Sequence, residues 1–544
     1  MRLRLGTRGS DLALWQARHV AARLAGRAEV ELVVLETRGD RIDDRPLTDV
    51  EGKAFFTAEI ERALLDRAVD LAVHSHKDLP TESPPGLLVA AVPPRADPAE
   101  LLLAGPAAHE PRAPLLPLAH GALVGTSSPR RMEQLRALRP DLRCESLRGN
   151  VPTRVRRLRE GRYAAILLAC AGVDRLELDL TGLHATRLAT GLLVPAPAQG
   201  ALAVQARADE PELLALLREM LHDETTARAI EAERWLLAHA GGGCNLPLGA
   251  QLVRDGADYR LLAFVGPDHP RPGRSARWVE GRGAVPLDAA RDALRLLEAD
   301  APSGCGPLAG RRIALAGRAD DEFGTRLGAR LAQLGARVRH EAVLLLQDLP
   351  VPNLPARVAG LRAGDALAVT SRAAAARLAG LQVADGVTVA AVGPATAEAL
   401  RAAGLRVDVV GSGGARELAD RLPQRDGARV LFPCAQDARP DLPAALAARG
   451  VAVERLPLYR TATAAAPPPA AACDTRVYLS PSAVAACESL GVREEAGARA
   501  LAWGFATAQA LAAAGRACAG DAGADAESLV ALLLLPQPAP EVSR

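Results

Sequence analysis

Lysine is almost missing from this sequence of 544 residues. Of its 66 basic residues, only Lys53 and Lys77 are lysines, and the others are arginines. An ammonium group is a compact point charge and a guanidinium group is a broad planar fork, so the two are not interchangeable at a crowded site. One interpretation is that both lysines survive by chance on a solvated surface. Their neighbours, EGKAFF and AVHSHKDLP, favour a specific role for each.

Other absences exclude whole classes of protein. Aromatic residues make up only 3% of the sequence and the formal net charge is +2, which argues against a surface for nucleic acid. No run of 18 or more apolar residues is present and the first residues form no apolar signal segment, so we expect no membrane span and a cytoplasmic location. The eight cysteines form no CxxC pair and no metal-type spacing with histidines, so we expect no disulfides and no metal site.

Short apolar β runs alternate with amphipathic helices in the first third, which predicts a parallel sheet and an α/β class. A proline-rich stretch at 104–121 and the segment APSGCGP at 301–307 mark passages between units. Beyond 307 the sequence repeats itself: the strand-helix units of 367–404 parallel those of 476–515. Such a repeat predicts two similar α/β lobes in the second half.

Arginines are dense between Ser128 and Arg162, where eleven occur. A solvated basic face and a nucleic-acid patch are the ordinary explanations. Several of them, however, stand at turns beside Gly, Ser or Pro, as do Arg8 in TRGS and Arg148 in SLRGN. A guanidinium at a loop that leads into a helix N-terminus can clamp a carboxylate or a phosphate. We therefore favour a small polyanion as the ligand.

Lys77 and Asp78 follow the apolar run LAVHSH, at the carboxyl end of a predicted strand. Open α/β sheets bind their ligands at such ends. An aspartate flanked by a cation can stabilise a developing positive charge or transfer a proton. The alternative is an ordinary turn aspartate that caps the next segment.

Cys244 ends a run of three glycines in HAGGGCNLPLGA. An exposed thiolate in a glycine loop is a nucleophile suited to covalent attachment. A buried cysteine beside a glycine run that ends a helix is the alternative interpretation.

Eight motifs in order closely resemble those of the hydroxymethylbilane synthase family, also called porphobilinogen deaminase. They are TRGSDLALWQA, TRGD, VHSHKDLP, VGTSSPRR, LRGNVPTR, LLACAGVDRL, PAQGALAVQAR and GGGCNLPLGA, and they span about residues 1 to 300. The repeated second half resembles the uroporphyrinogen-III synthase family through RRIALAGR, AVTS, VGPATAEAL, LPLYRT and the pair YLSPSAV and GFATAQAL.

The first resemblance implies a covalent dipyrromethane cofactor on Cys244 and a catalytic role for Asp78, with Lys77 beside it. It also implies that Lys53 and Phe56 belong to a mobile segment near the active site. The residues expected to hold the acid groups of the cofactor and the growing chain are Arg8, Ser10, Lys77, Thr126, Ser128, Arg130, Arg131, Arg148, Asn150, Arg154 and Arg175.

The second resemblance implies catalysis by binding and conformational control of a linear tetrapyrrole, through backbone amides and hydroxyl groups. Residues 478–480 read YLS where the family has FTS, which removes one hydroxyl. The candidate contacts are Thr370, Ser371, Thr396, Tyr459, Ser480, Ser482 and Thr507.

Together the resemblances imply two periplasmic-binding-protein-like lobes and a small α+β domain, followed by a two-lobed α/β module. The boundaries we expect are 1–94 with 195–218 for lobe 1, 95–194 for lobe 2, 219–300 for the small domain, 301–307 for a linker, 308–346 with 465–540 for lobe A, and 347–464 for lobe B.

The function implied is tetrapyrrole biosynthesis: four porphobilinogens condense head to tail with release of ammonia, and the hydroxymethylbilane product is cyclised to uroporphyrinogen III. One alternative is that only the first half is active and the second is a degenerate module that binds or stabilises. Another is a non-enzymatic two-lobed anion-binding protein. We expect small-molecule partners only, with no nucleic acid and no membrane, and a monomer.

Overall fold

The computed structural model describes most of the chain, and the ranges it describes are 1–36, 57–111, 113, 115–241, 246–269, 275–299, 305–318, 321–412, 414–422, 427–495, 497–523 and 526–534. Cys244, Lys53 and Phe56 lie outside these ranges. The described part is a mixed α/β protein with four sheets, as the sequence predicts. None of its helices is both long and apolar enough to cross a membrane.

Lobe 1 is a five-stranded sheet in the order β2-β1-β3-β10-β4. The strands are β1 (Arg2–Thr7), β2 (Glu29–Val34), β3 (Leu71–Ser75), β4 (Leu87–Ala91) and β10 (Leu202–Arg207). β1 runs parallel to β2 and β3, whereas β10 runs antiparallel to β3 and β4. The helices are α1 (Asp11–Leu24), α3 (Ala58–Leu65) and α7 (Pro211–Leu221). Leucines and valines of α1, α7 and the sheet form one core.

Lobe 2 is a second five-stranded sheet in the order β7-β6-β8-β5-β9. Its elements are β5 (Glu100–Ala104), β6 (Leu123–Gly125), α4 (Pro129–Leu138), β7 (Arg143–Glu145), α5 (Val151–Arg159), β8 (Ala165–Ala169), α6 (Cys170–Arg175) and β9 (His184–Leu188), with a short 3-10 turn η3 (Pro106–Ala108). The chain therefore enters lobe 2 before β5 and returns to lobe 1 at β10, which leaves two crossings between the lobes.

The small domain is an antiparallel sheet of β11 (Leu248–Asp255), β12 (Asp258–Val265) and β13 (Arg277–Gly283), covered by α8 (Glu224–His239) and α9 (Pro286–Glu298). The packing of α9 on β13 requires glycine, because a Cβ at Gly281 would lie 2.2 Å from the carbonyl oxygen of Ala289. The short side chains Ala289, Ala290 and Ala293 allow the same close approach, and all three are fully buried.

The second half contains a single ten-stranded sheet in the order β18-β17-β16-β19-β20-β15-β14-β21-β22-β23. Its strands are β14 (Arg312–Arg318), β15 (Arg337–Asp348), β16 (Ala366–Val369), β17 (Thr388–Ala391), β18 (Val409–Val410), β19 (Arg429–Ala435), β20 (Ala452–Thr463), β21 (Thr475–Tyr478), β22 (Arg499–Ala502) and β23 (Cys518–Asp521). Its helices are α10 (Glu322–Gln333), α11 (Leu354–Ala359), α12 (Arg372–Ala376), α13 (Pro394–Ala402), α14 (Ala415–Arg421), α15 (Asp441–Ala447), α16 (Pro481–Ser489), α17 (Phe505–Ala513) and α18 (Ala526–Leu534).

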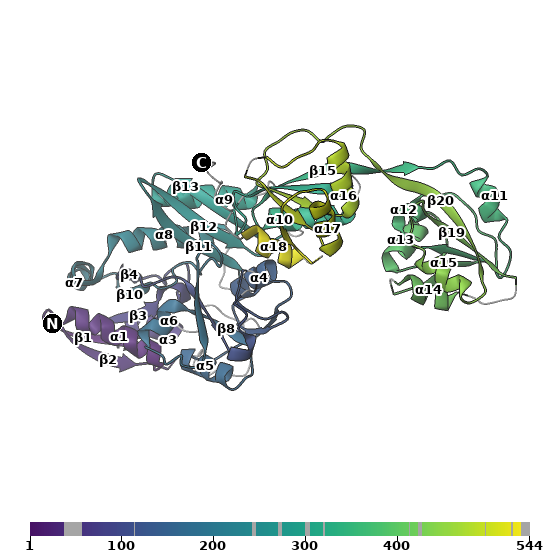
Figure 1. Cartoon of the computed structure of the whole chain (residues 1–544). Coiled ribbons are helices and arrows are strands. Elements are labelled where there is room, and N and C mark those ends of the chain that lie inside the picture. Colours follow the sequence, from purple (N-terminus) through teal and green to yellow (C-terminus); the bar gives the residue numbers. More distant parts are fainter. Residues whose placement is uncertain are drawn as a thin grey trace.

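The repeat seen in the sequence is confirmed. The series β14, α10, β15 matches β19, α15, β20, and the series β16, α12, β17, α13 matches β21, α16, β22, α17. Lobe A contains β14, β21 to β23, α10 and α16 to α18, and lobe B contains β16 to β19 and α11 to α15. The long strands β15 and β20 run through both, and they pair with each other only at 344–348 and 459–463. Figure 1 shows lobe B held away from lobe A by these two strands.

Candidate functional site

The turn that carries Lys77 and Asp78 follows β3, the central strand of lobe 1. The 3-10 turn η2 (His76–Asp78) is held at its start by the His76 N–H, which donates to the Ala201 carbonyl at 3.0 Å. Burial lowers the pKa of His76 to about 3, so this imidazole is neutral and packs as part of the lobe. Lys77 and Asp78 themselves are exposed to solvent. Lys77 and Asp78 thus follow the carboxyl end of a strand, as the sequence predicts.

The Lys77 ammonium donates to the side-chain oxygen of Gln199 at 3.2 Å. Desolvation lowers the pKa of Lys77 to about 8, although the negative charge of Asp78 acts in the opposite direction. Solvent reaches this side chain, yet protein atoms crowd around it closely enough to penalise its charge. The ammonium of Lys77 is thus partly shielded from water by the protein around it.

Glu100 on β5 joins two of the predicted anion-binding arginines. Its carboxylate is fully buried and pairs with Arg130 Nη2 and Arg131 Nη2, each at 2.5 Å. Burial raises the pKa of Glu100, but Arg131 and Arg130 outweigh that effect and lower it to about 2. Arg130 also donates to the Val194 carbonyl, and Arg131 to the Leu167 carbonyl. Both arginines are therefore largely committed to partners inside the protein.

The Nε atom of Arg131 differs from the other nitrogens of its guanidinium. Arg131 Nε is buried and has no hydrogen-bond partner among the described residues. Ser128, at the start of α4, caps the helix by accepting from the Arg131 N–H, and its own N–H donates to Thr126 Oγ1 at 3.3 Å. The N-terminus of α4 and the unpaired nitrogen of Arg131 both favour an anion.

Arg154 on α5 brings a further charge to the same region. Asn150 caps α5 by accepting from the Thr153 N–H at 3.0 Å, and Arg154 Nε donates to the Gly149 carbonyl at 2.7 Å. Burial, then repulsion from Arg131, lowers the pKa of Arg154 to about 10, while Asp78 raises it. Charges on η2, α4 and α5 therefore act on one another, and Arg148 also contributes.

The other predicted residues of this half lie at neighbouring strand ends. Arg8 follows β1, and its charge helps to lower the pKa of the buried His74 on β3, after the larger effect of burial. Ser10 caps α1 by accepting from the Ala13 N–H at 3.4 Å. Arg175 on α6 donates to the Gly200 carbonyl at 2.7 Å and lies over the ring of Trp15 on α1, 5.5 Å from its centre. The hydrogen bond of Arg175 is thus to the residue that follows Gln199.

Sequence reasoning missed the support behind Lys77. Glu233 on α8 is fully buried, pairs with Arg95 at 2.6 Å and accepts from the Ala198 and Leu252 N–H groups. Arg95 Nε donates in turn to the Gln199 carbonyl at 2.7 Å. Gly200 is required here, because its φ is +86° and a Cβ would lie 2.5 Å from the Ala96 carbonyl oxygen. The sequence signal that could have indicated this support is the motif PAPAQG at 195–200, which contains Gln199 and Gly200.

Cys244 lies outside the described residues, so its position is not part of this geometry. The segment before it is described. α8 ends at His239, whose ring stacks on Trp235 with 4.0 Å between centres. A cavity of about 180 Å³ adjoins this helix end, and its lining includes Gly241, His269 and Glu298.

The candidate residues of the second half occupy equivalent places in its two lobes. In lobe B, Ser371 caps α12 and its hydroxyl lies 2.9 Å from the Tyr459 hydroxyl, while Arg377 lies over the Tyr459 ring. Thr370 precedes Ser371 and is half-buried, and Thr396 on α13 is buried.

In lobe A, Ser480 caps α16 in the same way that Ser371 caps α12. Ser482 is exposed in the first turn of α16. The hydroxyl of Thr507 donates to the Trp503 carbonyl at 2.9 Å, so it is already used inside the protein.

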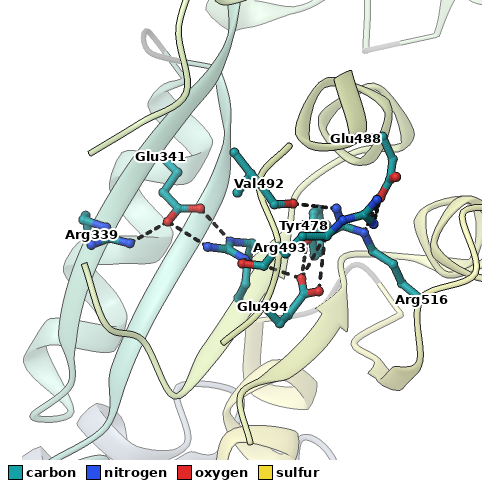
Figure 2. A network of polar contacts seen from close by, with 9 residues as sticks. Arg339, Glu341, Tyr478, Glu488, Val492, Arg493, Glu494 and Arg516 are labelled. Atoms are coloured by element: carbon teal, nitrogen blue, oxygen red, sulfur yellow. Dashed lines mark hydrogen bonds and ion pairs between the residues drawn. The ribbon is translucent and has the colours of Figure 1, made fainter. Parts of the chain in front are cut away.

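Tyr478, which begins the altered YLS motif, is fully buried in a polar network (Figure 2). Its hydroxyl donates to Glu494 and accepts from Arg516. Arg516 pairs with Glu488 at 2.5 Å, and Arg476 pairs with Glu341 at 2.7 Å. Desolvation and the hydrogen bond to Glu494 raise the pKa of Tyr478. The tyrosine hydroxyl therefore has a structural role inside lobe A.

Comparisons with known proteins bear on both halves. A family model described as porphobilinogen deaminase, dipyromethane cofactor binding domain, matches residues 3–215, and one described as uroporphyrinogen-III synthase HemD matches residues 325–477. The porphobilinogen deaminase of Syntrophomonas wolfei is 46% identical over 266 residues, which cover 48% of this chain and 84% of the relative. That of Nitratidesulfovibrio vulgaris strain Miyazaki F is 49% identical over 261 residues, 47% of this chain and 79% of the relative.

Among solved structures, a uroporphyrinogen III synthase of Thermus thermophilus matches with 23% identity and a TM-score of 0.27, over 41% of this chain and 96% of the other. A score this low adds no argument, so the assignment of the second half depends on the family model. The alternative of a non-enzymatic anion-binding protein is not favoured by these matches. The chain belongs to the porphobilinogen deaminase family, contains that family's dipyrromethane-binding domain, and carries a uroporphyrinogen-III synthase module in the same polypeptide, so it serves two steps of tetrapyrrole biosynthesis.

Proposed function

We propose that Asp78 is the carboxylate that assists the loss of ammonia from porphobilinogen, and that Lys77, Arg131 and Arg154 bind the acid groups around it. The observation that supports this is that the charge of Asp78, an exposed aspartate just after β3, acts on both Lys77 and Arg154, and that Arg131 acts on the same two residues. Ligand sites of open α/β sheets lie at such strand ends.

The residues present fit a dipyrromethane, whose rings carry acetate and propionate groups. A carboxylate only accepts hydrogen bonds, and the buried Arg131 Nε is a donor without a partner among the described residues. When bound, the cofactor supplies the pyrrole carbon on which chain growth begins. The residues we propose to hold its acid groups are Arg8, Ser10, Lys77, Thr126, Ser128, Arg130, Arg131, Arg148, Asn150, Arg154 and Arg175.

Asp78 acts on the substrate in this proposal. Loss of ammonia breaks the C–N bond of the aminomethyl group, and positive charge develops on the pyrrole that remains. A carboxylate close to that ring stabilises the charge, and it can accept the proton that the attacked ring carbon releases after the new C–C bond forms. Lys77 and Arg154 orient the ring through its acid groups, so its reactive end faces Asp78.

Activity of an Asp78→Asn variant tests this role. We expect kcat to fall by about 10²-fold to 10³-fold, since the amide keeps the shape but not the charge. Asp66→Asn is the matched control, because Asp66 is an exposed residue of the same lobe that pairs with Arg62. Equal activities of the Asp78→Asn variant and the wild type would refute the proposal.

We propose Cys244 as the covalent attachment point on the strength of its glycine loop and of the thiolate's reactivity. Intact mass of the purified protein is the test. The wild type and a Cys518→Ala control should carry the mass of two added pyrrole units, and Cys244→Ala should have the mass of the bare polypeptide. A wild-type mass equal to the bare sequence would contradict it.

For the second half we propose that hydroxyls and backbone amides of lobes A and B bind hydroxymethylbilane and control its closure. The support is the paired placement of Ser371 and Ser480 at equivalent helix starts of the two lobes. Synthetic hydroxymethylbilane given to the full chain should yield the type III isomer of uroporphyrinogen. If the type I isomer, which forms spontaneously, is the sole product, the second half is a degenerate module. We further propose that the protein is a cytoplasmic monomer. Light scattering after size-exclusion chromatography would measure its mass in solution.

A further inference from the structure

The two halves of the chain share one hydrophobic core. Leu135 and Leu138 of α4, Phe264 and Trp278 of the small domain, and Leu331 of α10 belong to a single cluster of buried residues. The same cluster also contains Leu529, Val530 and Leu533 of α18. Figure 1 shows α4 of the first half beside α10 and α18 of lobe A. Apolar side chains of both halves are therefore packed in one cluster, which is a contact beyond the covalent connection at 301–307.

Arg330 on α10 adds a specific polar contact at the end of α4. Its guanidinium donates to the carbonyls of Ala137 and Leu138, the latter at 3.2 Å. α4 ends at Leu138, so these carbonyls are among the last four of the helix and have no partner within it. A cation there also opposes the negative end of the helix dipole. Arg330 thus caps a helix of the other half.

α10 also contacts the small domain. Gln333, one turn after Arg330, donates to the Ala276 carbonyl at 3.4 Å, just before β13. The segment that leads into lobe A joins the contact as well: Leu308 is fully buried in the shared cluster, and its N–H donates to the Leu334 carbonyl at 2.8 Å. Lobe 2, the small domain and lobe A also have cores of their own, whereas the described core residues of β1 to β4 and α1 belong only to clusters outside the shared one.

We propose that the face of lobe A formed by α10 and α18 is a docking surface for the first half of the same chain, which holds α4 against the small domain. α4 carries Arg130 and Arg131 near its other end, about 10 Å along the helix axis. The synthase module therefore braces the helix that carries these two arginines. Lobe 2 and the small domain form one unit with lobe A.

Cleavage between the halves tests the docking. A protease site replaces residues 301–304 in the full chain, and complete cleavage is verified by mass under denaturing conditions. We expect the two fragments to co-elute at micromolar concentration, because the shared core holds them. Separate elution of two folded fragments would overturn the proposal.

Arg330→Ala tests the polar part of the contact, with Arg326→Ala as the matched control. Arg326 lies one turn earlier on α10, with 72% of its side chain exposed, and its ion pair is with Glu322 of the same helix. In the cleaved protein, loss of a charged hydrogen-bond donor should weaken the association by about ten-fold, and the control should leave it unchanged. Equal dissociation constants for the two variants would contradict the role of Arg330.

Hydrogen exchange on the uncut chain gives a second, independent measure. Amides of the peptide that covers the last turn of α4 should exchange several-fold faster in Arg330→Ala than in Arg326→Ala, since fraying of a helix end raises exchange. Peptides of α1 and α7 in lobe 1 should exchange at wild-type rates in both variants. Unchanged exchange in α4 would refute the brace even if the fragments stay together.

Discussion

The guanidinium of Arg131 forms a 2.5 Å ion pair with Glu100, a carboxylate that solvent does not reach. Glu100 accepts a second ion pair from Arg130, so one negative charge holds two buried positive charges in place. Both guanidinium groups are therefore fixed in place by contacts inside the protein, and the buried Nε of Arg131 has no hydrogen-bond partner among the described residues.

Replacement of Glu100 by glutamine should destabilise the protein strongly. The amide removes the charge that compensates Arg130 and Arg131, and breaking a buried ion pair in this way costs about 3 to 5 kcal/mol. Urea unfolding measures the change in the free energy of unfolding. Glu31→Gln is the control, because its pair with Arg2 is exposed and should contribute less than about 1 kcal/mol. A cost as small as that of the control would contradict the buried network.

The stability of the wild type should fall in acid through Glu100. Its pKa is lowered from 4.5 to about 2 in the folded state, so the unfolded chain binds a proton at higher pH than the folded protein. The resulting stabilisation is complete above pH 4.5 and is lost as the pH falls from 4.5 toward 2. Free energies of unfolding measured across this window should converge for wild type and Glu100→Gln. A constant difference between the two proteins would show that the charge is not the cause.

Lys77 should make substrate binding sensitive to mildly alkaline pH. Desolvation lowers its pKa to about 8, so the ammonium that binds an acid group is lost as the pH rises past that value. We expect KM for porphobilinogen to rise between about pH 7.5 and 9 in the wild type. Lys77→Arg keeps its charge over this range and should give a flatter profile. Parallel profiles for the two proteins would exclude Lys77 as the titrating group.

Tyr478→Phe should weaken lobe A. The change leaves Arg516 and Glu494 without the hydroxyl between them in a buried network, which costs about 1 to 3 kcal/mol. Hydrogen exchange of the peptides that cover β21 and β22 reports on the lobe directly. Tyr163→Phe removes a hydrogen bond to the Ser146 carbonyl in an exposed setting and serves as the control. Unaltered exchange in β21 would mean that the network does not support the lobe.

Much of this arrangement could be predicted from sequence, because the signals are local. The strand end that carries Asp78 follows from the apolar run before it, and the caps at Ser128 and Asn150 follow from the small polar residues that begin two arginine-rich helices. The repeat of the second half is likewise visible in the spacing of its Gly and Thr residues along the sequence. Each of these features depends on residues a few positions apart.

The partners of buried charges could not be predicted in this way. Glu100 lies 31 residues before Arg131, and Tyr478 lies 38 residues before Arg516. Only the tertiary fold brings such pairs together, and no periodicity marks them. The sequence predicts Arg130 and Arg131 as ligands of an external anion, but it gives no sign of their hydrogen bonds to Glu100, Val194 and Leu167. The role of Cys244 stays a prediction.

β15 and β20 pair antiparallel over only five residues each where they pass between lobes A and B. A ribbon of two strands resists stretching but twists readily, because no further strand stiffens it. Few backbone hydrogen bonds therefore join lobes A and B, and a change in the twist of this ribbon would change the angle between the two lobes.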